Sequence, residues 1–232
     1  MKLIAHMVGR NEADRYLVPV LERLSSFVDE IVFVDDNSTD DTPKIAKKYG
    51  AHVGLTPVAS GSAWEEHEGE FRMAAWNYLK PFASPGDWVL AIDCDEMLYG
   101  HQNIRNLMEQ DDYDVLGITF FHMWNEKQYR ADKAWHPTVS SRLFRYFEGG
   151  TYRNKALACG AEPTYVQDLI RSGRFNPQTG LKMKHLGYQR DEDKQAKHER
   201  YMRLDQGNFH SLAHLQSILD KEPKLVDWIW DD

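Results

Sequence analysis

The chain has little cysteine and no excess of basic charge. Only Cys94 and Cys159 are cysteines, and neither belongs to a CxxC motif or a Cys/His cluster. The sequence therefore excludes a disulfide framework and a cysteine-based zinc site, and we expect a reducing compartment, the cytoplasm. The 28 lysines and arginines stand against 36 aspartates and glutamates, and the net charge of −8 disfavours non-specific binding to polyanions such as DNA.

Long hydrophobic runs are also missing. The apolar residues from Met1 to Val8 are too few for the hydrophobic region of a signal peptide, and no stretch approaches the roughly 20 apolar residues that span a membrane. Apolar residues still make up 42% of the 232 residues, which is enough to bury a core. We therefore expect a single folded domain without an integral membrane segment.

Short apolar runs alternate with helical patterns in residues 1–96. Strands are expected at residues 2–8, 30–34, 51–55 and 88–92, and helices at 13–27, 45–49 and 62–79. This alternation predicts an α/β fold, with a mostly parallel sheet covered by helices on both faces. The second half is α+β in character, with strands expected at 113–122 and 139–146 and C-terminal helices within 191–221.

Carboxylates follow two of the expected strands. The strand at 30–34 runs into Asp35 and Asp36, and the strand at 88–92 runs into Asp93, Asp95 and Glu96. Ligands of open α/β sheets bind at the carboxyl ends of the strands, and carboxylates gathered there repel one another unless a cation or hydrogen-bond donors are present. Oxygen ligands suit Mg²⁺ or Mn²⁺, which commonly bridge protein carboxylates to phosphates. The sequence therefore predicts a divalent metal at this edge.

These motifs carry a resemblance to a known family. Together with Asn11-Glu12 and Tyr49-Gly50-Ala51, the segments 28–42 and 87–96 resemble the nucleotide-binding half of GT-A glycosyltransferases of the family 2 type. The resemblance implies one Rossmann-like GT-A domain over residues 1–232, with a nucleotide-binding half (1–96), an acceptor-side half (97–190) and a helical appendage (191–232). It also implies transfer of a sugar from a nucleotide-diphosphate donor to an acceptor hydroxyl, with Mn²⁺ or Mg²⁺ beneath the diphosphate.

The resemblance implies roles for individual residues. Asp36 matches the residue that accepts a hydrogen bond from the nucleotide base. Asp93 matches an acid that contacts the ribose or reaches the metal through water, and Asp95 matches the acid that ligates the metal. Arg72 matches a basic residue that faces the nucleotide, and a solvated helix charge is the alternative. Asn11 either contacts the nucleotide or caps the first helix.

A histidine from the second half is expected to complete the metal shell. The segments that resemble the acceptor-side half of bacterial and phage members are 141–145, 159–160 with Pro163, 184–188 and 197–201. A late histidine binds the metal in many GT-A enzymes, and His185, at the end of a short expected strand, is our candidate. It is preferred over His136, His122 and His6. A surface histidine without a metal is the alternative.

An inverting transfer also needs a carboxylate base within reach of the acceptor hydroxyl. Asp132 is the expected base, because it lies between Tyr129 and Trp135 in the loop that follows residues 113–122, where the acceptor should approach. Glu126 of the same loop is the second candidate. The aromatic residues of this loop, including Trp124, either stack on a sugar or fill the core, and the sequence does not separate the two. A retaining transfer would need neither carboxylate.

Other functions compete with this prediction. A nucleotidyltransferase that makes a sugar nucleotide also uses acidic metal ligands, but residues 9–12, Gly-Arg-Asn-Glu, lack its glycine-rich basic loop. A non-catalytic sugar-nucleotide-binding module is a further alternative, although Asp93 and Asp95 are both present. The expected acceptor is a glycan, a small molecule, a protein or, less favoured, a nucleic acid. Residues 182–203 carry seven lysines or arginines against four acids, an excess that also suits a clamp on a diphosphate.

Overall fold

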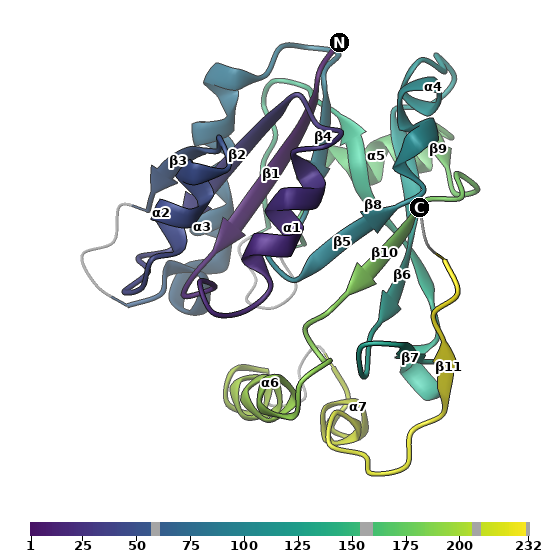
Figure 1. Ribbon diagram of the computed structural model, residues 1–232. Helices are drawn as coiled ribbons and strands as arrows, with labels where there is room; N and C mark the ends of the chain where they lie inside the picture. Colours follow the sequence, from purple (N-terminus) through teal and green to yellow (C-terminus); the bar gives the residue numbers. More distant parts are fainter. Residues whose placement is uncertain (57–60, 154–159, 206–209, 231–232) are drawn as a thin grey trace.

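A mixed β-sheet forms the centre of the protein (Figure 1). The computed structural model describes residues 1–56, 61–153, 160–205 and 210–230, and Cys159 lies outside them. The sheet begins with four parallel strands in the order β3 (His52–Leu55), β2 (Glu30–Asp35), β1 (Leu3–Gly9) and β4 (Trp88–Ala91). It continues with β8 (Thr138–Arg145), β6 (Val115–His122), β10 (Lys182–His185) and β5 (Glu96–Tyr99), and β9 (Phe175–Asn176) pairs with β6.

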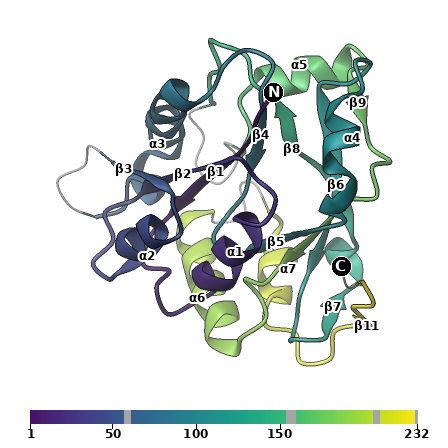
Figure 2. The same cartoon turned by 45° about the horizontal axis from the view of Figure 1, so that its top comes forward.

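Helices cover both faces of the sheet. The helices of the first half are α1 (Leu17–Leu24), α2 (Thr42–Lys48) and α3 (Ala63–Leu79), and those of the second are α4 (Ile104–Met108), α5 (Tyr165–Arg171), α6 (Asp191–Leu204) and α7 (Leu212–Ser217). Successive side chains of a strand point to opposite faces. In β1, Leu3 and Met7 belong to the buried cluster that includes residues of α1 and α2, whereas Ile4 belongs to the cluster that includes residues of α3 and α5. Figure 2 shows these helices around the sheet. The predicted α/β class is confirmed.

The two halves join through antiparallel strands that the sequence did not fully reveal. Strand β8 runs antiparallel to both β4 and β6, and β10 runs parallel to β6 but antiparallel to β5. The expected strands at 113–122 and 139–146 correspond to β6 and β8, whereas β5 follows the acidic segment so closely that periodicity gave no sign of it. The division into 1–96, 97–190 and 191–232 stays a prediction.

The aromatic residues of the loop after β6 fill the core. Trp124, Tyr129 and Trp135 are 6%, 8% and 2% exposed. Trp124 stacks on Tyr188 with ring centroids 5.7 Å apart, and Nε1–H of Trp135 donates to Oγ of Ser217 at 2.8 Å. Strand β7 (Gln128–Arg130), which is part of this loop, pairs with β11 (Leu225–Asp227) in a small second sheet. Buried rings cannot stack on a sugar, so the core-filling alternative is correct.

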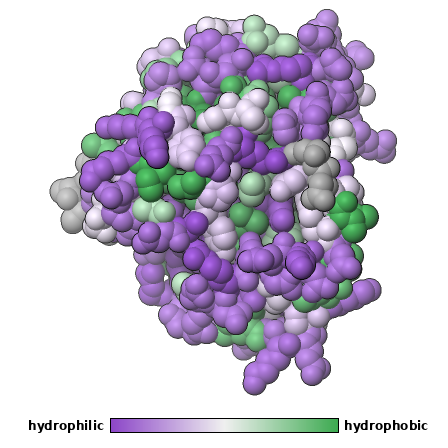
Figure 3. All heavy atoms as spheres, in the orientation of Figure 1, coloured by the Kyte–Doolittle hydropathy of each residue, from purple (hydrophilic) through white to green (hydrophobic). Residues whose placement is uncertain are grey.

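No helix within the described ranges has both the length and the apolar character needed to cross a membrane. Hydrophilic side chains predominate on the face shown in Figure 3, and apolar residues appear there only in small groups. Helices α6 and α7 lie beyond the end of the sheet toward which β1, β6 and β10 point (Figure 1).

His6 of β1 is a core residue. It is 6% exposed, and its ring nitrogen Nε2 lies 3.2 Å from the carbonyl oxygen of Ala75, to which it donates. Burial, assisted by the positive charge of Arg72, lowers the pKa of His6 to about 4. His6 is therefore neutral in the folded protein well below the pH at which an unfolded chain takes up a proton.

This difference predicts a pH dependence of stability. On acidification the unfolded state binds a proton near pH 6.5, before the folded state does, so the stabilisation from neutral His6 is present above pH 6.5 and is lost toward pH 4. Between pH 7 and pH 5 the native protein should lose about 1–2 kcal/mol more free energy of unfolding than His6→Gln. Urea unfolding at both pH values measures this, with His52→Gln on the edge strand β3 as control. Equal losses in the native protein and His6→Gln would contradict the prediction.

Candidate functional site

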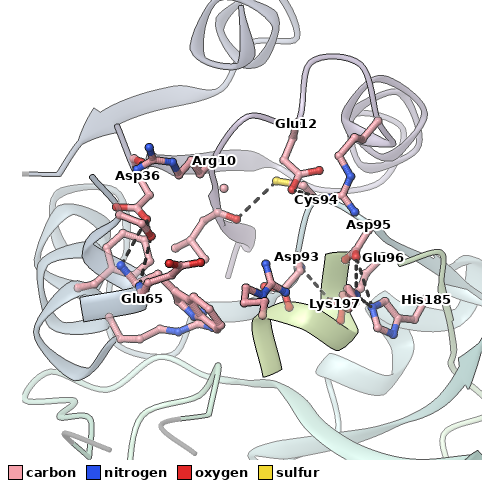
Figure 4. Close-up of a pocket in the computed structure, with 18 of the residues that line it drawn as sticks. Arg10, Glu12, Asp36, Glu65, Asp93, Cys94, Asp95, Glu96, His185 and Lys197 are labelled. Atoms are coloured by element: carbon pink, nitrogen blue, oxygen red, sulfur yellow. Dashed lines mark hydrogen bonds and ion pairs between the residues drawn. The ribbon is translucent and has the colours of Figure 1, made fainter. Parts of the chain in front are cut away.

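A cavity of about 680 Å³ opens at the carboxyl ends of β1, β2 and β4 (Figure 4). Its wall combines loops that follow these strands with side chains from α3, β8 and α6. Among the residues that the structure describes, six acidic and six basic side chains line it: Glu12, Asp36, Glu65, Asp93, Asp95 and Glu96, and Arg10, Arg15, Arg72, Arg142, Lys197 and Arg200. In a chain with a net charge of −8, this local balance suits a ligand that carries both a cation and an anion.

Asp36 lies at one end of the cavity, beneath the first turn of α3. Its Oδ1 accepts from the backbone N–H of Ala63 at 2.8 Å, and its Oδ2 accepts from the hydroxyl of Ser62 at 2.6 Å and from the N–H of Trp64 at 3.3 Å. These amides are donors that a helix start leaves unsatisfied. A carboxylate offers about four acceptor positions, and these contacts among the described residues use three of them.

Asn11 does not cap the first helix, so that alternative is wrong. Helix α1 begins at Leu17, with Tyr16 as its N-cap residue. Asn11 has a φ of 54°, a left-handed conformation that asparagine tolerates well, and its Oδ1 accepts from the N–H of Thr39 at 2.8 Å. Its own N–H donates to Oγ of Ser38 at 2.9 Å. Asn11 therefore ties the loop after β1 to the loop after β2, and its contact with a nucleotide stays a prediction.

Arg72 belongs to the cavity wall. Its side chain is only 12% exposed, and Nε lies 3.6 Å from Oε1 of Glu68, one turn earlier in α3. A fully solvated helix charge is therefore excluded. Its guanidinium is close enough to Asp93 to lower the pKa of that carboxyl, together with Arg142 and against the effect of burial.

Asp95, Glu96 and His185 meet at the other end of the cavity. One ligand atom from each lies within 4.8 Å of the others. The antiparallel pairing of β10 with β5 sets His185 opposite Glu96, which brings a distant part of the chain to the acids that follow β4. His185 ends a short strand, as predicted. His136 is exposed and outside the cavity wall, whereas His122 lies beside His185.

Lys197 of α6 completes this group. Its Nζ lies 3.2 Å from Oδ2 of Asp95 and 3.2 Å from Nε2 of His185. An ammonium group only donates hydrogen bonds, so Nε2 of His185 presents its lone pair. The proton is then on Nδ1 of His185, which donates to Nδ1 of His122 at 2.8 Å. Burial and the charge of Lys197 lower the pKa of His185, and the imidazole is neutral, the form that ligates a metal.

Asp95 is ionised in this setting. Burial by itself would raise the pKa of the Asp95 carboxyl, but the charge of Lys197 holds it well below its usual range. An ionised carboxylate beside a neutral imidazole is the donor set that a divalent cation requires.

Arg142 of β8 compensates the other two acids. Its Nη1 lies 3.0 Å from Oδ2 of Asp93 and 2.8 Å from Oε2 of Glu96. Burial and the negative charges of Asp93 and Asp95 raise the pKa of Glu96 to about 8, although Arg142 opposes the shift. From the sequence, Arg142 was identified only as part of the segment 141–145, which resembles the acceptor-side half of the family. A charged residue directly before the buried pair Leu143-Phe144, in the middle of β8, was the signal that could have identified it.

Glu12, which the sequence linked with Asn11 to the nucleotide or to a helix cap, and Arg15, which had no predicted role, are further cavity residues. Oε1 of Glu12 lies 2.8 Å from Nη1 of Arg15, whose Nη2 lies 3.0 Å from Oδ1 of Asp193 in α6. Burial, opposed by Arg15 and assisted by Asp95, raises the pKa of Glu12 to about 7. These contacts join the loop after β1 to α6 beside the acidic cluster.

The residues at the acidic cluster fit a divalent metal. Gly187 follows β10, and a Cβ built on it would overlap with Oδ2 of Asp95 and Nζ of Lys197. The missing side chain lets these two groups lie close to the backbone of Gly187. The carboxylate oxygens and the imidazole nitrogen of the cluster suit Mn²⁺, and the oxygens suit Mg²⁺.

Asp132 and Glu126 are not brought to this site. Among the described residues of the cavity wall neither occurs, and Glu126 is exposed in the turn between β6 and β7. Oδ1 of Asp132 accepts from Nε of Arg130 at 2.5 Å. Arg130 is fully buried and also donates to the carbonyl of Ser217 and to Oδ2 of Asp220. Asp132 therefore neutralises a buried guanidinium, and its role as a base stays a prediction that this geometry does not support.

Comparison with known sequences identifies a family and several relatives. Residues 6–170 match the family model described as Glycosyl transferase family 2. An uncharacterised protein of Mycobacterium tuberculosis is 24% identical over 218 residues, which cover 88% of this chain and 51% of that protein. An uncharacterised glycosyltransferase of Rickettsia conorii is 35% identical over 100 residues, which cover 42% of this chain and 30% of that protein. The chain thus spans about half the length, or less, of these relatives.

Solved structures share the fold. The crystal structure of S. aureus TarS 1–349 in complex with UDP has a TM-score of 0.55 at 18% identity, and the match covers 94% of this chain and 70% of that one. TarS 1–349 in complex with UDP-GlcNAc gives a TM-score of 0.54 at 17% identity, with the same coverage.

The close approach of Asp95 and Lys197 to Gly187 leads to a prediction about Mn²⁺ affinity. Gly187→Ala should weaken Mn²⁺ binding about 10- to 100-fold, because its Cβ overlaps with the ligand atom of Asp95. Isothermal titration calorimetry with Mn²⁺ measures the change. Gly86→Ala, in the turn before β4, is the control: it has a φ of 92° and open space around its Cβ, so it should lose stability but keep its Mn²⁺ affinity. Native Mn²⁺ affinity in Gly187→Ala would contradict the assignment.

The ion pair between Arg130 and Asp132 leads to a prediction about stability. Asp132→Asn should lower the free energy of unfolding by about 2 kcal/mol, since a buried guanidinium loses one ionised partner, and should leave turnover unchanged. Glu126→Gln, an exposed change in the same loop, should alter neither quantity. Denaturant unfolding and steady-state kinetics measure both. Loss of turnover at native stability in Asp132→Asn would instead restore the catalytic role expected from the sequence.

Proposed function

Because this chain belongs to glycosyl transferase family 2 and has its Rossmann-like GT-A fold, we propose that it is a metal-dependent glycosyltransferase that uses a nucleotide-diphosphate sugar as donor. The observation that carries the proposal is the arrangement of one cavity. An acceptor carboxylate, Asp36, lies at one end, and the cluster of Asp95, Glu96 and His185 lies at the other, with basic side chains on the wall between them (Figure 4).

The dimensions and polarity of the cavity favour such a donor. A volume of about 680 Å³ is in the range of small-molecule sites. The open acceptor position of Asp36 suits an N–H of a nucleobase, and Arg72 and Arg200 suit the diphosphate as charge-assisted donors. TarS, which shares the fold, was solved with UDP and with UDP-GlcNAc, so a uridine diphosphate sugar is the first donor to test.

The metal would be held by Asp95 and His185, with Asp93 or Glu96 nearby. When bound, a divalent ion supplies charge stabilisation to the departing diphosphate. Arg142 keeps Asp93 ionised by lowering its pKa against the effect of burial. Lys197 and Arg200 add further positive charge on the side of the cavity formed by α6.

In the proposed transfer, the oxygen of an acceptor hydroxyl forms a bond to the anomeric carbon while the bond from that carbon to the diphosphate breaks. The hydroxyl proton passes to a base, and the electron pair of the broken bond stays on the diphosphate. We propose inversion at the anomeric carbon; Asp132 and Glu126, the bases expected from the sequence, are not among the described residues of the cavity wall. The proposed acceptor hydroxyl belongs to a glycan, a small molecule or a protein, and a nucleic acid is less favoured.

A panel of nucleoside diphosphates tests the proposal. UDP, GDP, CDP, ADP and TDP are added with Mn²⁺ or with EDTA, and we expect one of them to raise the melting temperature only with Mn²⁺. Asp95→Asn should weaken the metal-dependent affinity by about 10- to 100-fold in calorimetry, because it removes an ionised ligand. Asp191→Asn, exposed at the start of α6, is the control and should bind normally.

Two results would decide against the proposal. If none of the nucleotides binds with Mn²⁺, or if Asp95→Asn keeps the native metal-dependent affinity, the donor assignment is wrong. Assays with the matching sugar nucleotide, and with a nucleoside triphosphate plus a sugar phosphate, separate the three functions that the sequence left open. Sugar transfer or hydrolysis indicates a glycosyltransferase, release of pyrophosphate from a nucleoside triphosphate and sugar phosphate indicates a nucleotidyltransferase, and binding without turnover indicates a binding module.

A further inference from the structure

A side chain of the protein itself fills the cation position beside Asp95. The ammonium of Lys197 donates to Oδ2 of Asp95 and to Nε2 of His185, the two atoms best suited to ligate a metal. The side chain of Lys197 is only 10% exposed. Lysine is rarely buried without a partner, and here both partners are proposed metal ligands.

The same space cannot hold the ammonium and a divalent ion together. A Cβ at Gly187 would overlap with Nζ of Lys197 as well as with Oδ2 of Asp95, which shows how closely these atoms surround one small volume. Two cations at such short range repel each other strongly in a buried site. A bound metal therefore requires Lys197 to move away.

Helix α6 offers the displaced ammonium a second position. Lys197, Arg200 and Arg203 recur at intervals of three residues and lie on one face of the helix. The Arg200 guanidinium lies 5.2 Å from the ring centroid of Trp64, and Nη2 of Arg203 lies 2.9 Å from Oε2 of Glu65, so α6 reaches across to α3. The row of positive charges thus runs from the acidic cluster toward the end that holds Asp36, along the expected path of the diphosphate.

We propose that Lys197 is an exchangeable internal cation of the donor site. In the metal-free protein its ammonium neutralises Asp95, and a divalent ion displaces it toward the diphosphate of the donor. Metal alone therefore binds weakly, because it has to displace the lysine, whereas metal and diphosphate together bind well. The diphosphate half of this inference rests on the proposed function, whereas the competition between lysine and metal does not.

Removal of the charge tests the exchange. Lys197→Met should bind Mn²⁺ alone about tenfold more tightly than the native protein, and should bind UDP, or whichever diphosphate the panel selects, about tenfold more weakly in saturating Mn²⁺. Calorimetry measures both affinities, and electron paramagnetic resonance of free Mn²⁺ gives the first independently. Mn²⁺ should also raise the melting temperature of Lys197→Met more than that of the native protein, because Asp95 has lost its internal cation.

Three further variants keep the test decisive. Lys197→Arg retains a positive charge and should bind Mn²⁺ no more tightly than the native protein. Lys194→Met lies one turn earlier in α6, where Nζ pairs with Asp191 at 2.9 Å outside the cavity wall, and should not alter either affinity. Lys197→Gln, which keeps a donor for Asp95, replaces Lys197→Met if that variant does not fold.

The outcomes separate this inference from the proposed function. Native or weaker affinity of the uncharged variants for Mn²⁺ alone would overturn the exchange, whatever the nucleotides do. Tighter Mn²⁺ binding together with unchanged diphosphate affinity would overturn the second position of Lys197. Absence of nucleotide binding in the native protein would defeat the proposed function, and the comparison with Mn²⁺ alone would still decide the competition.

Discussion

Buried negative charge at the end of β4 is the constraint on which the site depends. Asp93, Asp95 and Glu96 lie within four consecutive residues. Ionised carboxylates so close together repel one another unless cations lie beside them. Arg142 compensates Asp93 and Glu96, and Lys197 compensates Asp95. Arg142 comes from β8 and Lys197 comes from α6. The antiparallel position of β8 in the sheet and the placement of α6 therefore both bring positive charge to these acids.

This requirement explains why the second half of the chain has antiparallel strands. Strand β8 lies beside β4 and delivers Arg142 to the acids that follow it. Strand β10 pairs with β5 and places His185 opposite Glu96, and Gly187, two residues later, leaves room for Oδ2 of Asp95 and Nζ of Lys197. A parallel sheet with helices on both faces provides the acids, and the antiparallel addition provides the groups that make a cation site of them.

A second buried charge has a different result. Arg130 is surrounded by Trp124 and Trp135, with its guanidinium 4.7 Å and 5.3 Å from their ring centroids. Asp132 and Asp220 supply its counter-charges. The carboxylate and the aromatic rings that suggested an acceptor site thus belong to one packed cluster. The same residue types serve binding where they line a cavity and stability where they are enclosed.

The sequence by itself determined what depends on neighbours along the chain. Hydrophobic periodicity sets the alternation of strands and helices, and acids placed directly after strands must gather at one edge of a parallel sheet, which accounts for Asp36 and Asp95. His185 could be predicted as a metal ligand because residues 184–188 resemble a segment in the acceptor-side half of the family. Only the tertiary structure decided that Arg142 and Lys197 face these acids, that Asp220 lies beside Arg130, and that Asn11 joins two loops. Those pairings depend on strand order and helix placement, which join residues far apart in sequence and leave no periodic pattern in it.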